Sequence, residues 1–331
     1  MSAKRFAGGL FLGALATVAI WLALWAGQLG RSHPNNAWIE ASIAYKLAIA
    51  QGAGGPKIVT VAGSGALFGI DSALLEQRYG VAAVNLGVNA GISLPVILGT
   101  SLPAIGQDDL VLLPLEYPLY NRFEPVSESL VHWMNGHPEM LLWLPRLRAL
   151  KVVASTSTRR IFEGYRGIPE GFTVAGDYGP QRQDSRGDQI DTSRSLQEER
   201  HRRFLESLPA ERYGHEMQSG RLDHESLQAF RDAVLDRGAC PVFLPPPLRF
   251  EPSYLSDPVE AEYYRTLPER LRSAGLKWLG DPYDAMRPGD DFFDTNFHLM
   301  DEARQAYTEK VIAWLGPSPL ERCRDFHEGG R

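Results

Sequence analysis

A serine between two glycines is the first residue of this 331-residue chain whose position suits chemistry. Ser64 follows the short apolar run 57–62, which is typical of a strand buried on both faces of a parallel sheet. Open α/β sheets bind ligands at the carboxyl ends of their strands, so we expect Ser64 in such a crevice. Gly63 and Gly65 would let the backbone turn sharply and let a substrate approach closely. The pattern also fits an ordinary strand-to-helix turn, because it lacks the outer glycines of the G-x-S-x-G nucleophile elbow.

An acid and an imidazole near the far end of the chain form the second candidate group. Asp294 and His298 are four residues apart, just ahead of the helix expected at 301–315. Their position predicts that they stand at the same edge of the sheet as Ser64. A serine nucleophile needs a neighbouring base, and that base needs an acid that fixes its tautomer. A single loop histidine is also common at protein surfaces without any catalytic role.

Alternating apolar and helical patterns predict the sheet that would position these residues. Strands are expected at 57–62, 81–86, 109–115, 240–244 and 276–279, and helices at 36–50, 93–102, 224–237, 258–274 and 301–315. Strands and helices that alternate at this spacing indicate a parallel sheet with right-handed crossovers. The expected fold class is α/β, a three-layer sandwich around a central parallel sheet.

An uncharged N-terminal stretch predicts a membrane anchor. Residues 6–30 contain no charged side chain, and as a helix they would cross a hydrocarbon core of about 30 Å. This apolar run exceeds that of a cleaved signal peptide, which favours an anchor that stays on the protein. Lys4 and Arg5 precede the run and predict that the N-terminus is inside. We therefore expect a single-pass protein of the bacterial cytoplasmic membrane with a periplasmic main domain.

The domain organisation follows from these patterns. We expect a cytoplasmic N-terminus at 1–5, a transmembrane anchor at 6–30, a linker helix in 31–56, an α/β domain at 57–316 with an insertion at about 127–219, and a polar tail at 317–331. Within the insertion, 164–192 is a long polar stretch, and such loops are uncommon in compact domains unless they are functional or disordered. A substrate-facing loop beside Ser64 and a mobile surface loop remain alternatives.

Composition limits the classes of partner. The formal net charge of −6 provides no basic footprint for nucleic acid, so we expect none as a ligand. We expect no metal ion and no organic cofactor. Cys240 and Cys323 would be able to pair in an oxidising compartment, but their positions do not require a disulfide.

Three short blocks of the sequence resemble the SGNH (GDSL-like) hydrolase superfamily. They are GSGALFGID at 63–71, NLGVNAG at 85–91 and DTNFHL at 294–299. They are most similar to the membrane-anchored branch that is related to the teichoic-acid D-alanylation and alginate O-acetylation proteins. The similarity covers about 57–120 and 240–315, and it implies a flavodoxin-like sandwich of the SGNH type.

The resemblance implies a role for each candidate residue. Ser64 would be the nucleophile, His298 the general base and Asp294 its orienting partner. The sequence departs from the family pattern at both of these motifs. Gly63 stands where the family has the aspartate of GDS, and the interval between Asp294 and His298 is one residue longer than usual.

The sequence contains only part of the set of oxyanion donors that the family has. The resemblance implies the backbone N–H groups of Ser64 and Gly87 as donors. The Gly-x-Asn-Asp block of the family is missing, and Asn89 is a candidate replacement for its donor. Glu116, which follows the third strand, is either a site residue or a structural carboxylate that holds a loop N–H.

Two functions are implied by the resemblance. The first is an anchored acyl-ester hydrolase or O-acyltransferase that moves an acyl group, with acetyl expected, on a cell-surface or exported polysaccharide. A membrane-bound O-acyltransferase would be its partner. The second is a catalytically inactive relative that binds a glycan or serves as a scaffold subunit in a polysaccharide export or modification complex.

Overall fold

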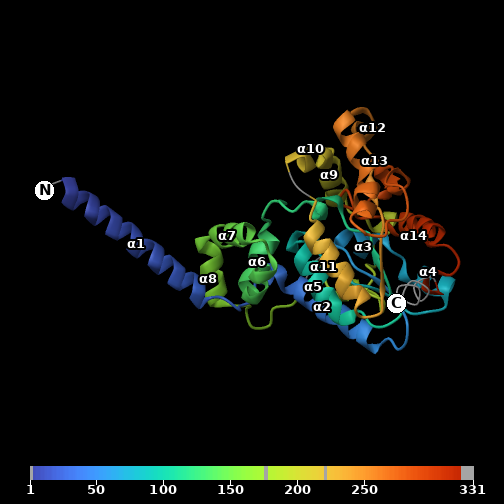
Figure 1. The fold of residues 1–331 in the computed structure, drawn as a ribbon. Coiled ribbons are helices and arrows are strands. Elements are labelled where there is room, and N and C mark those ends of the chain that lie inside the picture. Colours follow the sequence, from blue (N-terminus) through green and yellow to red (C-terminus); the bar gives the residue numbers. More distant parts are fainter. Residues whose placement is uncertain (1–2, 175–177, 220–221, 322–331) are drawn as a thin grey trace. The chain divides into compact units, whose positions relative to one another are not determined.

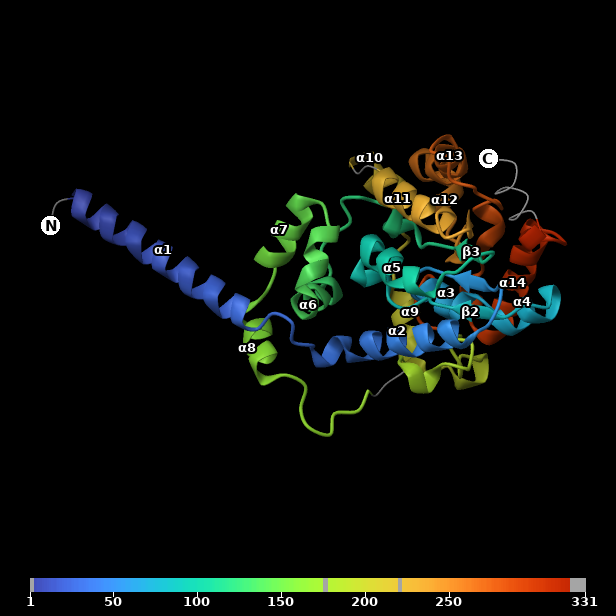
Figure 2. The same ribbon diagram turned by 60° about the horizontal axis from the view of Figure 1, so that its bottom comes forward.

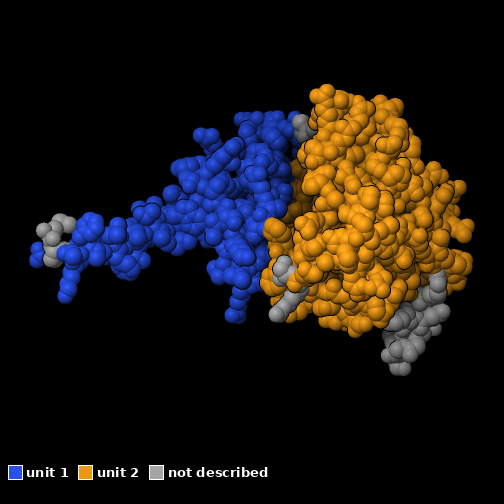
Figure 3. All heavy atoms as spheres, turned by 90° about the horizontal axis from the view of Figure 1, so that it is seen from above, with its two compact units in different colours: residues 1–37, 126–174 blue, residues 38–125, 175–331 orange. Residues whose placement is uncertain are grey.

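The computed structural model describes residues 3–174, 178–219 and 222–321, which belong to two compact units. One unit comprises residues 1–37 and 126–174, and the other comprises 38–125 and 175–331. Figure 3 colours them separately. We call the first the anchor unit, because it contains the predicted anchor, and the second the sheet unit. The insertion predicted at 127–219 is divided between them.

A four-stranded parallel sheet forms the centre of the sheet unit (Figure 2). Its strands are β1 (Ile58–Thr60), β2 (Ala83–Asn85), β3 (Leu110–Leu113) and β4 (Cys240–Phe243), in the order β2-β1-β3-β4. All three neighbouring pairs are parallel. A separate parallel pair joins β5 (Leu248–Arg249) to β6 (Met286–Arg287).

The fifth strand predicted from the sequence is reduced to one bridge. Trp278 makes a single parallel bridge to Phe243 at the end of β4. Gly275 and Gly280 bracket this segment with φ angles of 77° and 85°, a left-handed conformation that ends an extended run on both sides. The segment 276–279 is therefore too short to form a ladder.

Helices occupy most of the rest of the sheet unit (Figure 1). They are α3 (Ser64–Gly69), α4 (Ser72–Tyr79), α5 (Leu94–Ser101), α9 (Glu199–Ser207), α10 (Tyr213–Ser219), α11 (His224–Leu235), α12 (Ser253–Ser256), α13 (Pro258–Ser273) and α14 (Asp301–Leu315). Helix α2 (Pro34–Gly52) begins in the anchor unit and continues into the sheet unit.

Buried apolar side chains on alternate strand positions build the core. Ile58 and Leu112 belong to one buried cluster with Leu75 of α4 and with Tyr307 and Val311 of α14. Alternation places successive strand residues on opposite faces, so these helices cover the face that carries Ile58 and Leu112. The strands are buried along their whole length, as the uninterrupted apolar runs predict.

The anchor unit contains four complete helices in its described part. They are α1 (Ala3–Gly27), α6 (Glu128–Gly136), α7 (Arg146–Ala154) and α8 (Thr158–Arg166). Helix α1 has 25 residues with a mean hydropathy of 2.0 in its most apolar window, and it is long and apolar enough to cross a membrane. Gln28, just after α1, donates a 2.5 Å hydrogen bond to Asn135 of α6, which ties the end of the predicted anchor stretch to the first half of the predicted insertion.

A buried ion pair joins the start of β1 to the start of β3. Asp109 is completely buried, and its Oδ2 lies 2.7 Å from Lys57 Nζ. The same carboxylate accepts the backbone N–H of Lys57 at 3.0 Å and that of Gly106 at 2.7 Å. It therefore neutralises the charge of Lys57 and accepts two backbone N–H groups at the end of the sheet where β1 and β3 begin.

The substitution Asp109→Leu should lower the free energy of unfolding by about 3–5 kcal/mol, because it leaves the charge of Lys57 buried without its partner. The double variant Lys57→Met/Asp109→Leu removes both charges and should lose clearly less. Urea denaturation of the full chain in detergent measures both changes. A double variant as unstable as the single one would show that the uncompensated charge is not the cause.

Candidate active site

Ser64 lies where the direction of the sheet connections reverses. It is the first residue of α3, directly after β1, and Gly63 is the N-cap residue of that helix. The chain continues from β1 to β2 on one side and later places β3 on the other side of β1. In an open parallel sheet, such a switch point leaves a crevice at the carboxyl ends of the strands. Ser64 stands at this position with its side chain half-buried.

Glu116 binds the backbone on both sides of Ser64. It follows β3, is almost completely buried, and accepts the N–H of Gly63 at 2.9 Å and that of Gly65 at 2.6 Å. Burial raises the pKa of Glu116, while these N–H groups and the charge of His298 oppose the rise. These are the contacts of the structural carboxylate that the sequence left as one of two alternatives.

The same carboxylate explains the two glycines. A Cβ atom at Gly63 would lie 2.5 Å from Oε1 of Glu116, and one at Gly65 would lie 3.1 Å from its Cγ. Gly63 has φ −80°, a conformation that any residue adopts. The glycines therefore make room for Glu116, whereas the sequence predicted a sharp turn and the approach of a substrate.

Asp294 and His298 form a buried hydrogen-bonded pair ahead of α14. His298 Nδ1 lies 2.6 Å from Asp294 Oδ1, and the Tyr178 hydroxyl donates to Asp294 Oδ2 at 2.7 Å. Burial by itself would raise the pKa of Asp294, but the charge and hydrogen bond of His298 and the hydroxyl of Tyr178 hold it below its ordinary value. A carboxylate at Nδ1 favours the tautomer whose Nε2 is free to accept a proton.

The imidazole lies against the helix that begins with Ser64. The rings of His298 and Phe68 are stacked, with centroids 4.0 Å apart and planes 3° apart. Phe68 comes four residues after Ser64 in α3, and residues at this spacing share one face of a helix. Ser64 and His298 are thus brought to the same side of α3, although the described residues show no hydrogen bond between them.

The expected oxyanion donors differ in availability. The N–H of Gly87 is already engaged, because it donates to Oδ1 of Asn85 at 2.9 Å. Asn89 uses its Oδ1 to accept the N–H of Gly91 at 2.6 Å, and its amide Nδ2 has no bond to a described residue. The backbone N–H of Ser64 likewise has no acceptor within the described ranges. Ser64 and Asn89 are therefore the remaining donors of the predicted set.

The second half of the predicted loop 164–192 packs directly on the site. Its Asp188 accepts hydrogen bonds from both the N–H and the hydroxyl of Ser72, at 2.7 and 2.8 Å. The N–H of Gln189 donates to Leu67 O in α3 at 3.0 Å. Sequence reasoning missed these residues and Tyr178, because no motif or spacing marks a partner more than 100 positions away.

A polar cavity of about 330 Å³ adjoins this loop. Its lining consists of Arg182, Gln189, Ile190, Asp191, Thr192, Leu196, Glu198, His201 and Phe293. Phe293 immediately precedes Asp294, and the His201 ring lies 4.7 Å from the Phe293 ring. One lining residue is therefore the direct sequence neighbour of Asp294, and the cavity has a size within the usual range of small-molecule sites.

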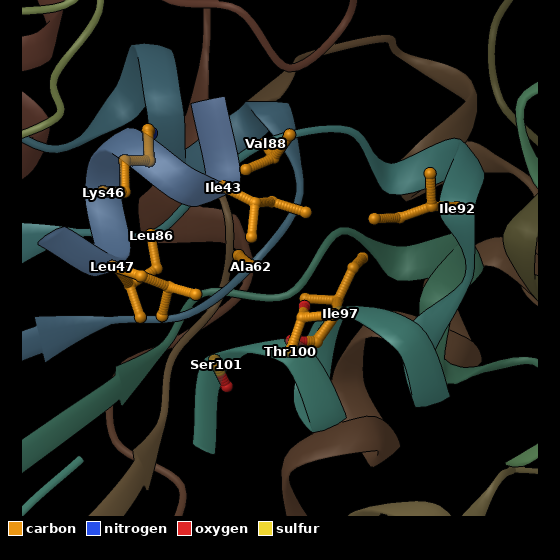
Figure 4. Close-up of a pocket in the computed structure, with 10 residues that line it drawn as sticks. All are labelled: Ile43, Lys46, Leu47, Ala62, Leu86, Val88, Ile92, Ile97, Thr100 and Ser101. Atoms are coloured by element: carbon orange, nitrogen blue, oxygen red, sulfur yellow. The ribbon is translucent and has the colours of Figure 1, made fainter. Parts of the chain in front are cut away.

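A second cavity, behind the Gly87 turn, is too small for a substrate. It measures about 20 Å³, room for little more than one water molecule, and Lys46 lies in its wall among apolar side chains (Figure 4). Lys46 is fully buried and donates to the carbonyl oxygen of Gly87. Burial lowers the pKa of Lys46 to about 7, against the opposing charges of Asp188 and Asp184.

Lys46 should make stability rise with pH. The folded chain releases this proton near pH 7 and the unfolded chain only near its ordinary value of about 10.4, so the unfolded state holds more protons between them. Between pH 7 and pH 9 the gain should be about 2 kcal/mol, and Lys46→Met should lack it. Urea denaturation at both pH values measures the difference, with exposed Lys151→Met as the control. An equal gain in wild type and Lys46→Met would contradict this assignment.

Comparisons of the chain with family models, with curated proteins and with solved structures found no match. The functional assignment therefore depends on the geometry of the chain's own residues. The strongest feature of that geometry is the Asp294–His298 pair, which contacts the helix that begins with Ser64.

Proposed function

We propose that the chain is a membrane-anchored serine acyl-ester hydrolase or O-acyltransferase of the SGNH type. The observation that carries this proposal is the position of His298, which is hydrogen-bonded to Asp294 on one side and stacked on Phe68 of α3. These groups come from opposite ends of the chain. A base oriented by an acid, beside a serine at a sheet switch point, is the arrangement that nucleophilic acyl transfer needs.

The chemistry would proceed in two half-reactions. Ser64 Oγ attacks the ester carbonyl carbon while His298 Nε2 takes the hydroxyl proton, and the resulting oxyanion is bound by the Ser64 N–H and the Asn89 amide. Collapse of this intermediate breaks the ester bond, and the departing alcohol receives the proton from His298. Water or an acceptor hydroxyl then attacks the acyl-Ser64 ester, which gives hydrolysis or transfer and restores the serine. Asp294, held by Tyr178, keeps the imidazole in the required tautomer.

A hydroxyl-rich substrate fits the cavity beside the pair. Its side chains offer guanidinium, carboxylate, amide and imidazole groups around the apolar Phe293, Ile190 and Leu196. Such a mixture supplies hydrogen bonds in several directions together with some apolar contact, as the binding of a sugar ring requires. We therefore propose an extracytoplasmic polysaccharide as the acyl carrier, with acetyl as the acyl group.

The finer fold and the location belong to the same proposal. The order β2-β1-β3-β4, with Trp278 bridged beyond β4, supports a flavodoxin-like three-layer sandwich of the SGNH type. Helix α1 supports a single-pass anchor in the bacterial cytoplasmic membrane. Lys4 and Arg5 support an N-terminus on the cytoplasmic side. A membrane-bound O-acyltransferase that delivers the acyl group is the proposed partner.

A second candidate function is glycan binding without catalysis. The observation in its favour is that two of the backbone donors near Ser64, the N–H groups of Gly63 and Gly65, are bound by Glu116. The N–H of Gly87 is also bound. An inactive relative would keep the polar cavity and the anchor and would use them inside an export or modification complex.

The variant Ser64→Ala separates the two functions. With p-nitrophenyl acetate and the full chain in detergent, kcat/KM should fall at least about 1,000-fold, because the nucleophile acts only in the reaction. The melting temperature should stay within about 2 °C, because the Ser64 side chain has no hydrogen-bond partner among the described residues.

The matched control is Ser207→Ala, an exposed serine of α9 in the same unit. It should retain full esterase activity. Turnover that is equal in wild type, Ser64→Ala and Ser207→Ala would reject Ser64 chemistry and leave the binding function.

A further inference from the structure

The anchor unit exposes large apolar side chains on two consecutive segments. Leu142, Leu147 and Leu150 are 89%, 61% and 66% exposed. Leu147 and Leu150 are three residues apart in α7 and share one face of that helix. Phe162 of α8 is 56% exposed. Soluble surfaces carry isolated apolar residues, whereas clusters of this kind mark an interaction site.

Both helices bury an arginine and expose large apolar side chains. In α7, Arg148 is buried while its neighbour Leu147 is exposed. In α8, Arg160 is only 1% exposed, and its guanidinium donates to Gln28 Oε1 at 2.7 Å and to Arg31 O at 3.0 Å. A helix of a water-soluble domain turns its apolar stripe inwards. Here α7 and α8 bury Val152 and Ile161 but also turn large apolar side chains outwards.

The exposed face is continuous with the apolar anchor. The Tyr165 hydroxyl of α8 donates to the carbonyl oxygen of Leu24 in α1 at 3.0 Å. The guanidinium of Arg31 lies over the Tyr165 ring, 5.3 Å from its centroid. Helix α8 lies against the end of α1, and α7 lies close by, in both ribbon views (Figure 1, Figure 2). The contact is made in the last turn of α1, and the stacked Trp21 and Trp25 lie within its last two turns.

Basic side chains accompany the apolar ones. Residues 126–174 contain six Lys or Arg and four Asp or Glu, in a chain whose formal net charge is −6. Arg146, Lys151, Arg159 and Arg166 are exposed on α7 and α8. Aromatic and aliphatic residues with basic neighbours are typical of helices that lie in the headgroup region of a bilayer. Trp and Tyr are likewise enriched at that depth.

We propose that the interfacial face, defined as Leu142, Trp143, Leu147, Leu150, Phe162 and Tyr165, is inserted into the headgroup region of the membrane that α1 crosses. The occupant of this face is lipid, because the face begins where the anchor ends. This inference rests on the proposed anchor. It adds a second attachment, through which the anchor unit lies on the bilayer surface as well as being tethered to it.

A photoreactive phospholipid tests this proposal. The full wild-type chain is reconstituted in vesicles of phosphatidylethanolamine and phosphatidylglycerol that carry a phospholipid with a diazirine near the glycerol end of its acyl chain. After illumination, the labelled peptides are mapped. Peptides of α1 and peptides within 142–166 should carry lipid. The matched control is the peptide around Leu255, which is 59% exposed but lies in the sheet unit.

Labelling within 142–166 should exceed that of the Leu255 peptide at least about five-fold, and Leu147→Glu/Leu150→Glu should remove most of it while α1 stays labelled. If α1 is labelled but the peptides within 142–166 carry no more lipid than the Leu255 peptide, the proposal that the interfacial face is inserted is overturned. The proposed anchor would stand. Unlabelled α1 would overturn the anchor, and this inference with it.

Discussion

The geometry of the site depends on the two hydrogen bonds that the carboxylate of Glu116 accepts from the backbone. This carboxylate comes from the end of β3 and binds the two N–H groups that flank Ser64, at the end of β1. The two strands are neighbours at the switch point, so one side chain joins both walls of the crevice. It fixes where α3 begins, and Phe68, on which His298 is stacked, takes its position from the same helix.

A second contact from the opposite strand completes this support. Asn85, at the end of β2, donates to Ala66 O in α3 at 2.8 Å and also accepts the N–H of Gly87. Helix α3 is therefore held by a carboxylate from β3 and by an amide from β2. This rigidity has a chemical consequence, because the N–H groups of Gly63, Gly65 and Gly87 are used for structure. Of the oxyanion donors predicted from the sequence, the Ser64 N–H and the Asn89 amide remain without a partner among the described residues.

How much of the fold and of the candidate site could be predicted depends on how far apart in the sequence the contacting residues are. Uninterrupted apolar runs predict the four strands, and a strand end predicts the crevice position of Ser64. Asp294 and His298 are four residues apart, so their pairing needs only local geometry. The contact between Tyr178 and Asp294 joins a loop to a distant turn, and neither the residue types nor their spacing predicts it. Glu116 was ambiguous for the same reason, because only the fold shows which N–H groups its carboxylate meets.

The two compact units of the structure divide a stretch that the sequence predicted as one piece. Residues 127–219 were expected as one insertion, since the strand–helix alternation stops there. In the structure, residues up to 174 join the anchor, whereas the later ones join the sheet. Buried polar groups cause the first association, because Gln28 meets both Asn135 and Arg160. Arginine is usually a surface residue, so the sequence pattern does not predict that Arg160 is buried against Gln28.

The Asp294–His298 pair and the Ser64 side chain are held to different degrees. Asp294 and His298 are buried and are fixed by a hydrogen bond, by Tyr178 and by the Phe68 ring. Ser64 has a fixed backbone, but its half-buried hydroxyl bonds to none of the described residues. A serine side chain moves among three staggered positions about a single torsion. For the proposed function the base is therefore preorganised, whereas the Ser64 hydroxyl would take its position by rotation about this torsion. Such a division suits the proposed chemistry, in which the serine would alternate between a free hydroxyl and an acyl ester.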